Sequence, residues 1–264
     1  MFWMLSLLAW SGIVSSAPPA EALREYREAA SRFSSLVAEA EAGEKVAQLR
    51  SPEFKKLVEI LSDEQTMLAA SAEPENDVEA DLELCGITNN AIVSLAIFDI
   101  RGNIPKTDDQ QESMSNFKVM MSRNLLVFQD ELKELQPFLI RCLAKAVSKV
   151  DRFLGSLGPG QLTDVRRRGV VKMRTGILMT YSSGLAIAND TGTALRVDYR
   201  TAFLSVLAET AEAYASMMPL PERKKIAEAA GSAALSGDEQ YQAYLISIAR
   251  AFRNEECSTI CKIE

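Results

Sequence analysis

Residues Leu84–Ile100, LCGITNNAIVSLAIFDI, form the most apolar segment that follows the N-terminal leader, and they decide the fold class. On a helical wheel the apolar side chains of this segment cover every direction, which is typical of a helix enclosed by other helices. A strand is the less favoured alternative. We therefore expect these residues to form a central, fully buried helix that ends at Gly102-Asn103-Ile104-Pro105.

Amphipathic helical patterns flank this segment on both sides. Upstream, apolar residues recur at spacings of three and four from residue 23 to residue 40. Ser51-Pro52-Glu53 then has the features of a helix start, with a hydroxyl cap, a proline at the first position and an acid in the first turn. Downstream, an apolar stripe indicates a further helix that Pro137 interrupts or kinks. The stripe comprises Met114, Phe117, Met121, Leu125, Phe128, Leu132 and Leu135.

The rest of the chain continues the helical pattern. Further helices are expected at residues 138–157, 162–188, 193–218, 221–230 and 238–253. No segment shows the alternation of a half-buried strand. The sequence therefore predicts an all-α fold, a single bundle-like domain of about seven or eight helices with no significant β-sheet.

The expected layout along the chain has five parts. They are a signal peptide at residues 1–17, an N-terminal helical pair at 18–71, an acidic connector at 72–83, the main helical bundle at 84–256 and a disulfide-closed tail at 257–264. The connector is inferred from acidic residues at every second position from Glu73 to Glu83, a spacing that gives no helical face. An acidic strip that binds a partner is the alternative interpretation.

The leader predicts export. Its apolar run, residues 2–14, is too short to span a bilayer, and it ends in Ser15-Ser16-Ala17, which suits a signal peptidase. Cleavage near Ala17 would give a secreted or periplasmic protein that does not span a membrane when mature. A buried N-terminal helix is the alternative. Asn189-Asp190-Thr191 is a glycosylation sequon only if the source organism glycosylates.

Export gives the four cysteines an interpretation as disulfides. Three connectivities are possible for four cysteines. Cys257 and Cys261 are spaced to close a small loop in the tail, and Cys85 and Cys142 would then join two helices that lie 57 residues apart. A metal site at Cys257 and Cys261 is disfavoured, because the sequence offers no second pair of Cys or His ligands at a suitable spacing.

The sequence contains no histidine, which excludes whole classes of chemistry. Ser/His/Asp and Cys/His catalysis are ruled out, as are His-ligated zinc, copper, iron and haem sites. We nominate no catalytic residue, metal or cofactor. The net charge of −7 and the predicted export argue against nucleic acid as a partner. A histidine-free helical enzyme that uses Arg and Glu on an anionic or glycan substrate remains the alternative function.

Helical phase directs three arginines toward the core. Arg166 falls within the apolar arc of its predicted helix, and Arg196 and Arg200 fall within or beside the arc of the next one. A buried guanidinium needs a carboxylate or an anionic ligand. We therefore expect an anion-binding cluster of these three residues, or internal ion pairing in which Asp99, Asp198, Glu209 or Glu212 is a counter-charge.

These observations favour binding over catalysis. The leading prediction is an exported, soluble, α-helical binding or accessory protein of the periplasm or cell exterior. Its partner would be a protein, or an anionic small molecule or lipid held by the arginines and by an apolar surface. The methionine and phenylalanine stripe is interpreted as core, because a groove would require it to be exposed.

Overall fold

The structure is a computed structural model that describes residues 21–43, 46–71, 78–100, 109–189, 194–236 and 238–263. These residues form ten α-helices and one 3-10 helix, with no β-strand among them, so the predicted all-α class is confirmed. The predicted signal peptide lies outside the described residues.

The helices follow one another along the chain. Their bounds are α1 Glu21–Ala42, the 3-10 helix η2 Val46–Arg50, α2 Pro52–Leu61, α3 Glu64–Ser71, α4 Val78–Ala96, α6 Gln110–Val127, α7 Gln129–Ser156, α8 Asp164–Asn189, α9 Val197–Met217, α10 Leu220–Ser236 and α11 Glu239–Arg253. Local capping sets several starts. The side chains of Ser51, Asp109 and Asp238 each accept a hydrogen bond from a backbone N–H in the first turn that follows.

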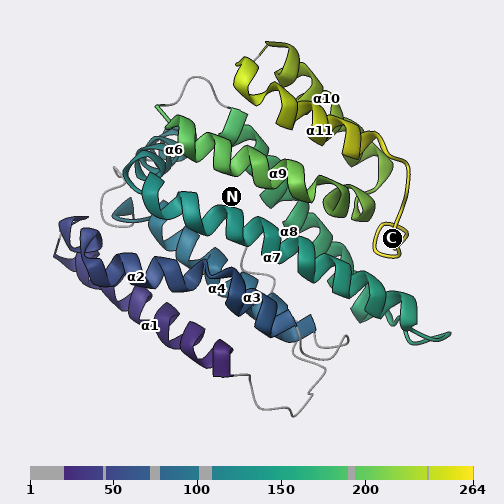
Figure 1. Ribbon diagram of the computed structural model, residues 1–264, viewed down its shortest axis with the longest axis horizontal. Helices are drawn as coiled ribbons and strands as arrows, with labels where there is room; N and C mark the ends of the chain where they lie inside the picture. Colours follow the sequence, from purple (N-terminus) through teal and green to yellow (C-terminus); the bar gives the residue numbers. More distant parts are fainter. Residues whose placement is uncertain are drawn as a thin grey trace.

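The larger helices are stacked side by side in a row (Figure 1). Helix α1 packs on α4, α4 on α7, α7 on α9, α9 on α11 and α11 on α10, while α8 lies against α9. One continuous core runs through this row, so the N-terminal helices are not a separate lobe. Tyr26 of α1 illustrates the continuity, because its ring stacks on Phe138 of α7 and its hydroxyl donates to the carbonyl of Leu61 at 2.8 Å.

The central helix of the row is α7 rather than the predicted helix at residues 84–100. Helix α7 is the longest and packs on both α4 and α9. Helix α4 ends at Ala96, and Ile92, Val93 and Ile97 are only half-buried. The apolar pattern of the sequence therefore predicted more burial than α4 has. Among the described helices, α4 packs mainly on α1 and α7 and makes smaller contacts with α3 and α6.

The predicted acidic connector is partly helix. Residues 72–77 lie outside the described residues, but residues 78–83 form the first turns of α4. Val78, Ala80 and Asp81 are buried there. The acidic residues at alternate positions therefore include the start of a helix, in which Asp81 faces the core and Glu79 is exposed.

The predicted interruption of the helix at Pro137 is wrong. Pro137 lies buried inside α7, and the helix interruption occurs at Phe128, which ends α6 and begins α7. The fully buried Phe128 ring packs edge-on against Phe98, with ring centroids 5.4 Å apart. Asn124 Nδ2 donates to the carbonyls of Ala96 and Phe98, at 3.1 and 2.7 Å. The stripe from Met114 to Leu135 is therefore divided between two helices.

Helices α8 and α9 form an antiparallel hairpin. The Tyr181 hydroxyl donates to the Leu207 carbonyl at 2.7 Å, and Gly184 faces Phe203. A Cβ atom at position 184 would lie 2.9 Å from Phe203 Cζ, so glycine permits the close approach of the two helices. The antiparallel direction of this hairpin determines the positions of Arg166, Arg196 and Arg200, the three arginines of the expected cluster.

Candidate functional site

Arg196 and Arg200 lie near the start of α9 and are already engaged by the protein. Arg196 precedes the helix as its N-cap, and its guanidinium lies 2.6 Å from an Asp130 carboxylate oxygen and 3.0 Å from an Asp198 oxygen. Arg200 donates to the Ala188 carbonyl at 3.0 Å, and its guanidinium lies 4.8 Å from the centre of the Tyr241 ring. Both residues therefore hold helices together rather than line a cavity.

Arg166 is not part of the same cluster. It lies in the first turn of α8, where its guanidinium donates to the Gln161 carbonyl at 2.7 Å. Arg200 instead contacts the C-terminal end of α8, near Ala188. At 1.5 Å per residue, the distance along α8 from Arg166 to that end is about 35 Å. The hairpin thus separates Arg166 from the other two arginines, and the expected three-residue cluster is not formed.

Asp99 is not the counter-charge of Arg196. Asp130 and Asp198 take that role, and hydrogen bonds from Arg196 and Lys133 hold the pKa of the Asp198 carboxyl well below its ordinary range. Asp99 lies beyond the end of α4, in a left-handed turn with φ of 58°, and its backbone N–H donates to Glu41 of α1 at 3.1 Å.

A row of ion pairs runs along α7. We call it the α7 charge row, and it joins Asp130, Glu131, Lys133 and Arg141 of α7 to residues of η2, α3 and α9. The pairs are Arg50 with Glu131 at 2.8 Å, Lys133 with Asp198 at 3.1 Å, Arg141 with Glu64 at 2.6 Å and Arg141 with Glu209 at 3.0 Å, beside the Arg196 pairs already described. Burial raises the pKa of Glu131, and Arg50 partly opposes that shift.

A polar cleft of about 250 Å³ lies over this row. Lys133 and Arg141 line it, and each is already bound to carboxylates, while Glu134 adds a further negative charge. Its cations are therefore neutralised, which does not favour an anionic ligand. The Glu209 carboxylate accepts hydrogen bonds from Arg141. Among the described residues, no group of three acids or cysteines is arranged to hold a metal ion.

A buried ion pair joins α4 to α7. Lys149 Nζ lies 2.7 Å from an Asp81 carboxylate oxygen, and both side chains are almost completely buried. The Cys85–Cys142 disulfide joins the same two helices nearby, with the Asp81 carbonyl 3.7 Å from Cys142 Sγ. These four residues therefore form a structural cross-link within the core rather than an accessible site.

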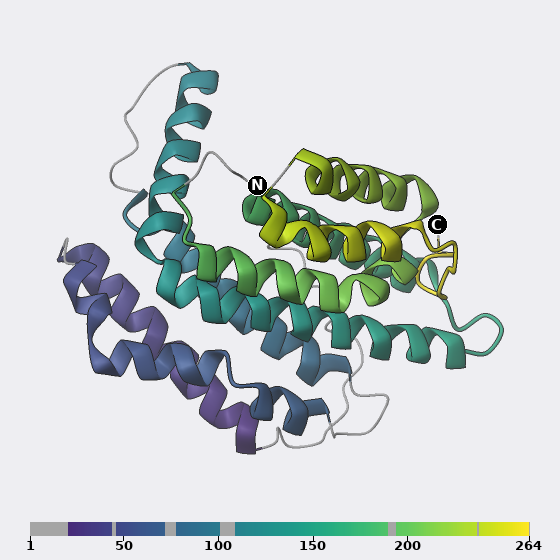
Figure 2. The same ribbon diagram turned by 45° about the horizontal axis from the view of Figure 1, so that its top comes forward.

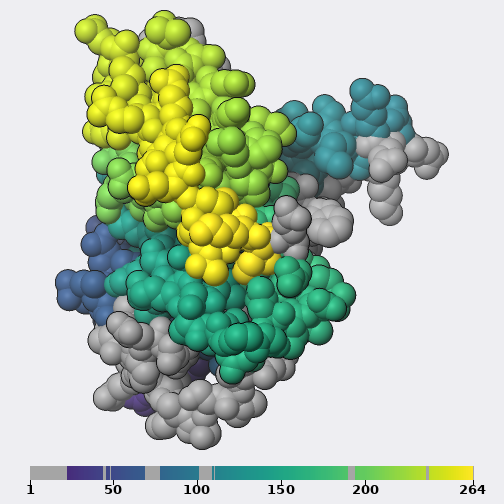
Figure 3. All heavy atoms as spheres, turned by 90° about the vertical axis from the view of Figure 1, so that its right-hand side faces the viewer, coloured from purple at the N-terminus to yellow at the C-terminus, as the bar shows by residue number. Residues whose placement is uncertain are grey.

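Helix α6 projects from the row of helices (Figures 2 and 3). Between residues 111 and 123 none of its described side chains is buried, although several are apolar. Met114 is 51% exposed and Val119 is 66% exposed. The first described side chain of α6 that is buried is Asn124, which anchors the helix to the end of α4. The predicted core assignment is therefore wrong for Met114, while Phe117 and Met121 are only half-buried and Leu125 packs against the core.

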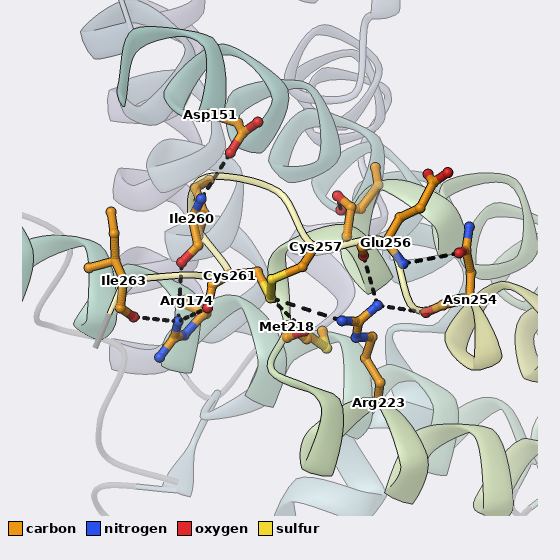
Figure 4. The surroundings of a disulfide bond; sticks show 12 residues. Asp151, Arg174, Met218, Arg223, Asn254, Glu256, Cys257, Ile260, Cys261 and Ile263 are labelled. Atoms are coloured by element: carbon orange, nitrogen blue, oxygen red, sulfur yellow. Dashed lines mark hydrogen bonds between the residues drawn. A yellow bond between two sulfur atoms is a disulfide. The ribbon is translucent and has the colours of Figure 1, made fainter. Parts of the chain in front are cut away.

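The C-terminal tail forms a small disulfide-closed loop on the molecular surface (Figures 3 and 4). Buried Ile260 and Ile263 anchor the tail, and the backbone N–H of Ile260 donates to Asp151 of α7 at 2.9 Å. Two arginines hold its main chain. Arg174 of α8 donates to the carbonyls of Ile260, Cys261 and Ile263, while Arg223 of α10 donates to those of Asn254 and Glu256. Both predicted disulfides are thus present.

Comparison with known protein families, curated proteins and solved structures finds no match for this chain. No described helix is both long enough and apolar enough to cross a membrane.

Sequence reasoning missed Lys149, Arg223 and the exposure of α6. For Lys149 and Arg223, the spacing from neighbouring residues in the sequence indicates where the side chain lies. Lys149 lies two turns after Cys142, and Asp81 one turn before Cys85, so antiparallel helices place both charges on the same side of the disulfide. Arg223 precedes Ile226 by three residues and so shares its buried face. The exposure of α6 has no local signal, because an apolar stripe does not reveal what covers it.

Proposed function

We propose that this protein is an exported, disulfide-stabilised α-helical binding protein that uses α6 to bind a helix of a partner protein. The observation that carries the proposal is the exposure of α6. Most of a helix's stability in a protein comes from packing of its apolar face, and residues 111–123 of α6 have no buried side chain among those described.

A partner helix suits the spacing of the α6 side chains. Met114, Met121 and Leu125 are seven and four residues apart, so they follow one line along the helix, as in helix pairs. Met114 is exposed and the other two are half-buried. Methionine is flexible and polarisable, which suits a surface that adapts to the shape of a partner. The resulting line of apolar side chains is about 16 Å long at 1.5 Å per residue.

Two disulfides support the export part of the proposal. All four cysteines are paired, and disulfides persist in oxidising compartments outside the cytosol. The predicted leader at residues 1–17 and cleavage near Ala17 are part of this proposal. The anionic-ligand carrier and the histidine-free enzyme gain less support, because the cations of the α7 charge row and Arg196 are bound to carboxylates.

The proposal predicts that two charges on α6 abolish partner binding. We expect the double variant Met114→Glu/Met121→Glu, purified from the native source, to lose a partner that wild-type protein retains in native mass spectrometry. The reason is that each glutamate would be desolvated on the apolar surface of the partner. The matched control is Leu235→Glu on α10, where the side chain is 89% exposed, and it should retain the partner.

Three outcomes would contradict the proposal. The first is a partner that remains bound to the α6 double variant. The second is a homodimer in place of a complex with another protein. The third is a fall of several degrees in the melting temperature of an unbound double variant, which would mean that the chain itself covers Met114 and Met121.

A further inference from the structure

The two disulfides lie in different environments. Cys85 and Cys142 are buried between α4 and α7 and join positions 57 residues apart. Cys257 and Cys261 are both partly exposed and are separated by only four positions. Exposed disulfides are the ones that exchange with thiols, whereas buried ones are protected from attack.

A buried cation lies beside one sulfur atom of the exposed disulfide. The Arg223 side chain is only 2% exposed, and its guanidinium Nη2 donates to Cys261 Sγ at 3.9 Å (Figure 4). Arg223 has no ion pair with a described carboxylate, and its Nε atom is buried without a hydrogen-bond partner among the described residues. A guanidinium is a permanent cation in proteins, and a neighbouring cation stabilises a thiolate.

The other groups around the loop do not cancel this charge directly. The carbonyl oxygen of Met218 lies 3.4 Å from Cys261 Sγ and favours a neutral thiol. Asp151 of α7 binds the backbone N–H of Ile260, and Arg174 of α8 binds the carbonyl of Cys261. Within the tail, Glu255, Glu256 and Lys262 are exposed to solvent, which screens their charges. The described charged side chain in contact with the sulfur is therefore Arg223.

The loop does not depend on its disulfide for its position. Arg174 and Arg223 bind five carbonyl groups in and beside the loop, between Asn254 and Ile263. Ser258 donates its backbone N–H to the Ser216 carbonyl at 2.9 Å, and Ile260 is fully buried. After reduction these contacts would keep the two thiols close together and beside Arg223. A pair of thiols that stays close in both states is what reversible exchange requires.

We propose that Cys257 and Cys261 form a redox-active pair that exchanges with substrate dithiols, while Cys85–Cys142 remains a structural disulfide. A substrate thiolate attacks Cys257 Sγ, the bond between Cys257 and Cys261 breaks, and its electron pair moves to Cys261 Sγ, which leaves as a thiolate beside Arg223. The second substrate thiolate then attacks the substrate sulfur of the mixed disulfide and releases Cys257 as a thiolate. The substrate loses two electrons and becomes a disulfide, and the two cysteines of the protein take them up and bind protons from water.

The first test uses the folded wild-type protein with dithiothreitol as the dithiol probe. Samples are quenched with N-ethylmaleimide, and mass spectrometry locates the labelled cysteines. We expect Cys257 and Cys261 to be labelled at least about tenfold faster than Cys85 and Cys142. Equal rates for the two disulfides, or labelling of Cys257 and Cys261 only after unfolding, would overturn the proposal.

The second test measures how Arg223 acts on Cys261. In the Cys257→Ser variant, Cys261 is a single free thiol, and thiolate absorbance against pH gives its pKa. We expect a pKa below the value of about 8.5 that an ordinary cysteine has. Adding Arg223→Met should return the pKa to about 8.5 or higher, whereas Arg223→Lys, which keeps the positive charge, should preserve much of the lowering.

Arg174→Met is the matched control for loosening of the tail. It removes hydrogen bonds to three carbonyls of the tail but no described contact with sulfur. The pKa of Cys261 should therefore remain low in Cys257→Ser/Arg174→Met. A pKa at or above 8.5 in Cys257→Ser alone, or an equal rise with Arg174→Met and Arg223→Met, would refute the role assigned to Arg223.

Discussion

Replacing Lys149 with methionine is expected to lower the free energy of unfolding by about 3–5 kcal/mol. Lys149 Nζ lies 2.7 Å from Asp81 in the interface between α4 and α7, where neither side chain reaches solvent to any large extent. Methionine preserves most of the volume but removes the positive charge. The Asp81 carboxylate then stays buried beside an apolar side chain, and this desolvation is the physical reason for the loss.

The double variant Asp81→Leu/Lys149→Met tests that reason. It removes both charges, so urea denaturation should show that it recovers most of the stability lost in Lys149→Met. A double variant no more stable than the single one would contradict the account, because the loss would then come from packing. A loss below about 1 kcal/mol in Lys149→Met would show that the pair behaves like a surface ion pair.

Removing the Cys85–Cys142 disulfide is expected to lower the free energy of unfolding by about 4 kcal/mol. The bond closes a loop of 57 residues, and the unfolded chain regains that conformational freedom when both cysteines become alanine. The matched comparison is Cys257→Ala/Cys261→Ala, which opens a loop of only four positions and should lower the free energy by about 2 kcal/mol.

Urea denaturation of the two variants under the same conditions compares these losses. Equal losses would contradict the assignment of Cys85–Cys142 as the main covalent cross-link. Because Asp81 and Lys149 join the same two helices, the effect of Cys85→Ala/Cys142→Ala should not add exactly to that of Lys149→Met.

The sequence predicts best where structure is determined locally. The cap at Ser51 and the proline that follows it set the start of α2 as expected, and the helix predicted from residue 238 begins after its cap, Asp238. Both disulfide pairs were predicted because the short spacing of Cys257 and Cys261 leaves one partner for each remaining cysteine. These signals depend on neighbouring residues rather than on tertiary packing.

The predicted arginine cluster is not formed, because it depended on where α9 begins and on which ends of α8 and α9 lie together. Helix α9 begins at Val197, so Arg196 is a cap outside the helix and the helical wheel does not apply to it. The α8–α9 hairpin separates Arg166 from Arg200, although both lie near the start of their own helices. Helical phase gives the direction of a side chain but not which end of an antiparallel neighbour it meets.

The exposure of α6 and the break at Phe128 also depend on tertiary structure. The apolar stripe continues through Phe128 without interruption in the sequence, yet its side chains are fully buried only from Phe128 onward. Asn124 provided a local hint, because a polar residue beside an apolar stripe needs a partner, and it finds one in the carbonyls at the end of α4.

The most direct test of the central claim, that this is an exported and disulfide-stabilised protein, is the intact mass of the protein recovered from its native source. The account predicts a protein in the envelope or medium whose mass corresponds to loss of residues 1–17 and of four hydrogens, one pair for each disulfide. A full-length protein with four free thiols, recovered from the cytosol, would contradict it.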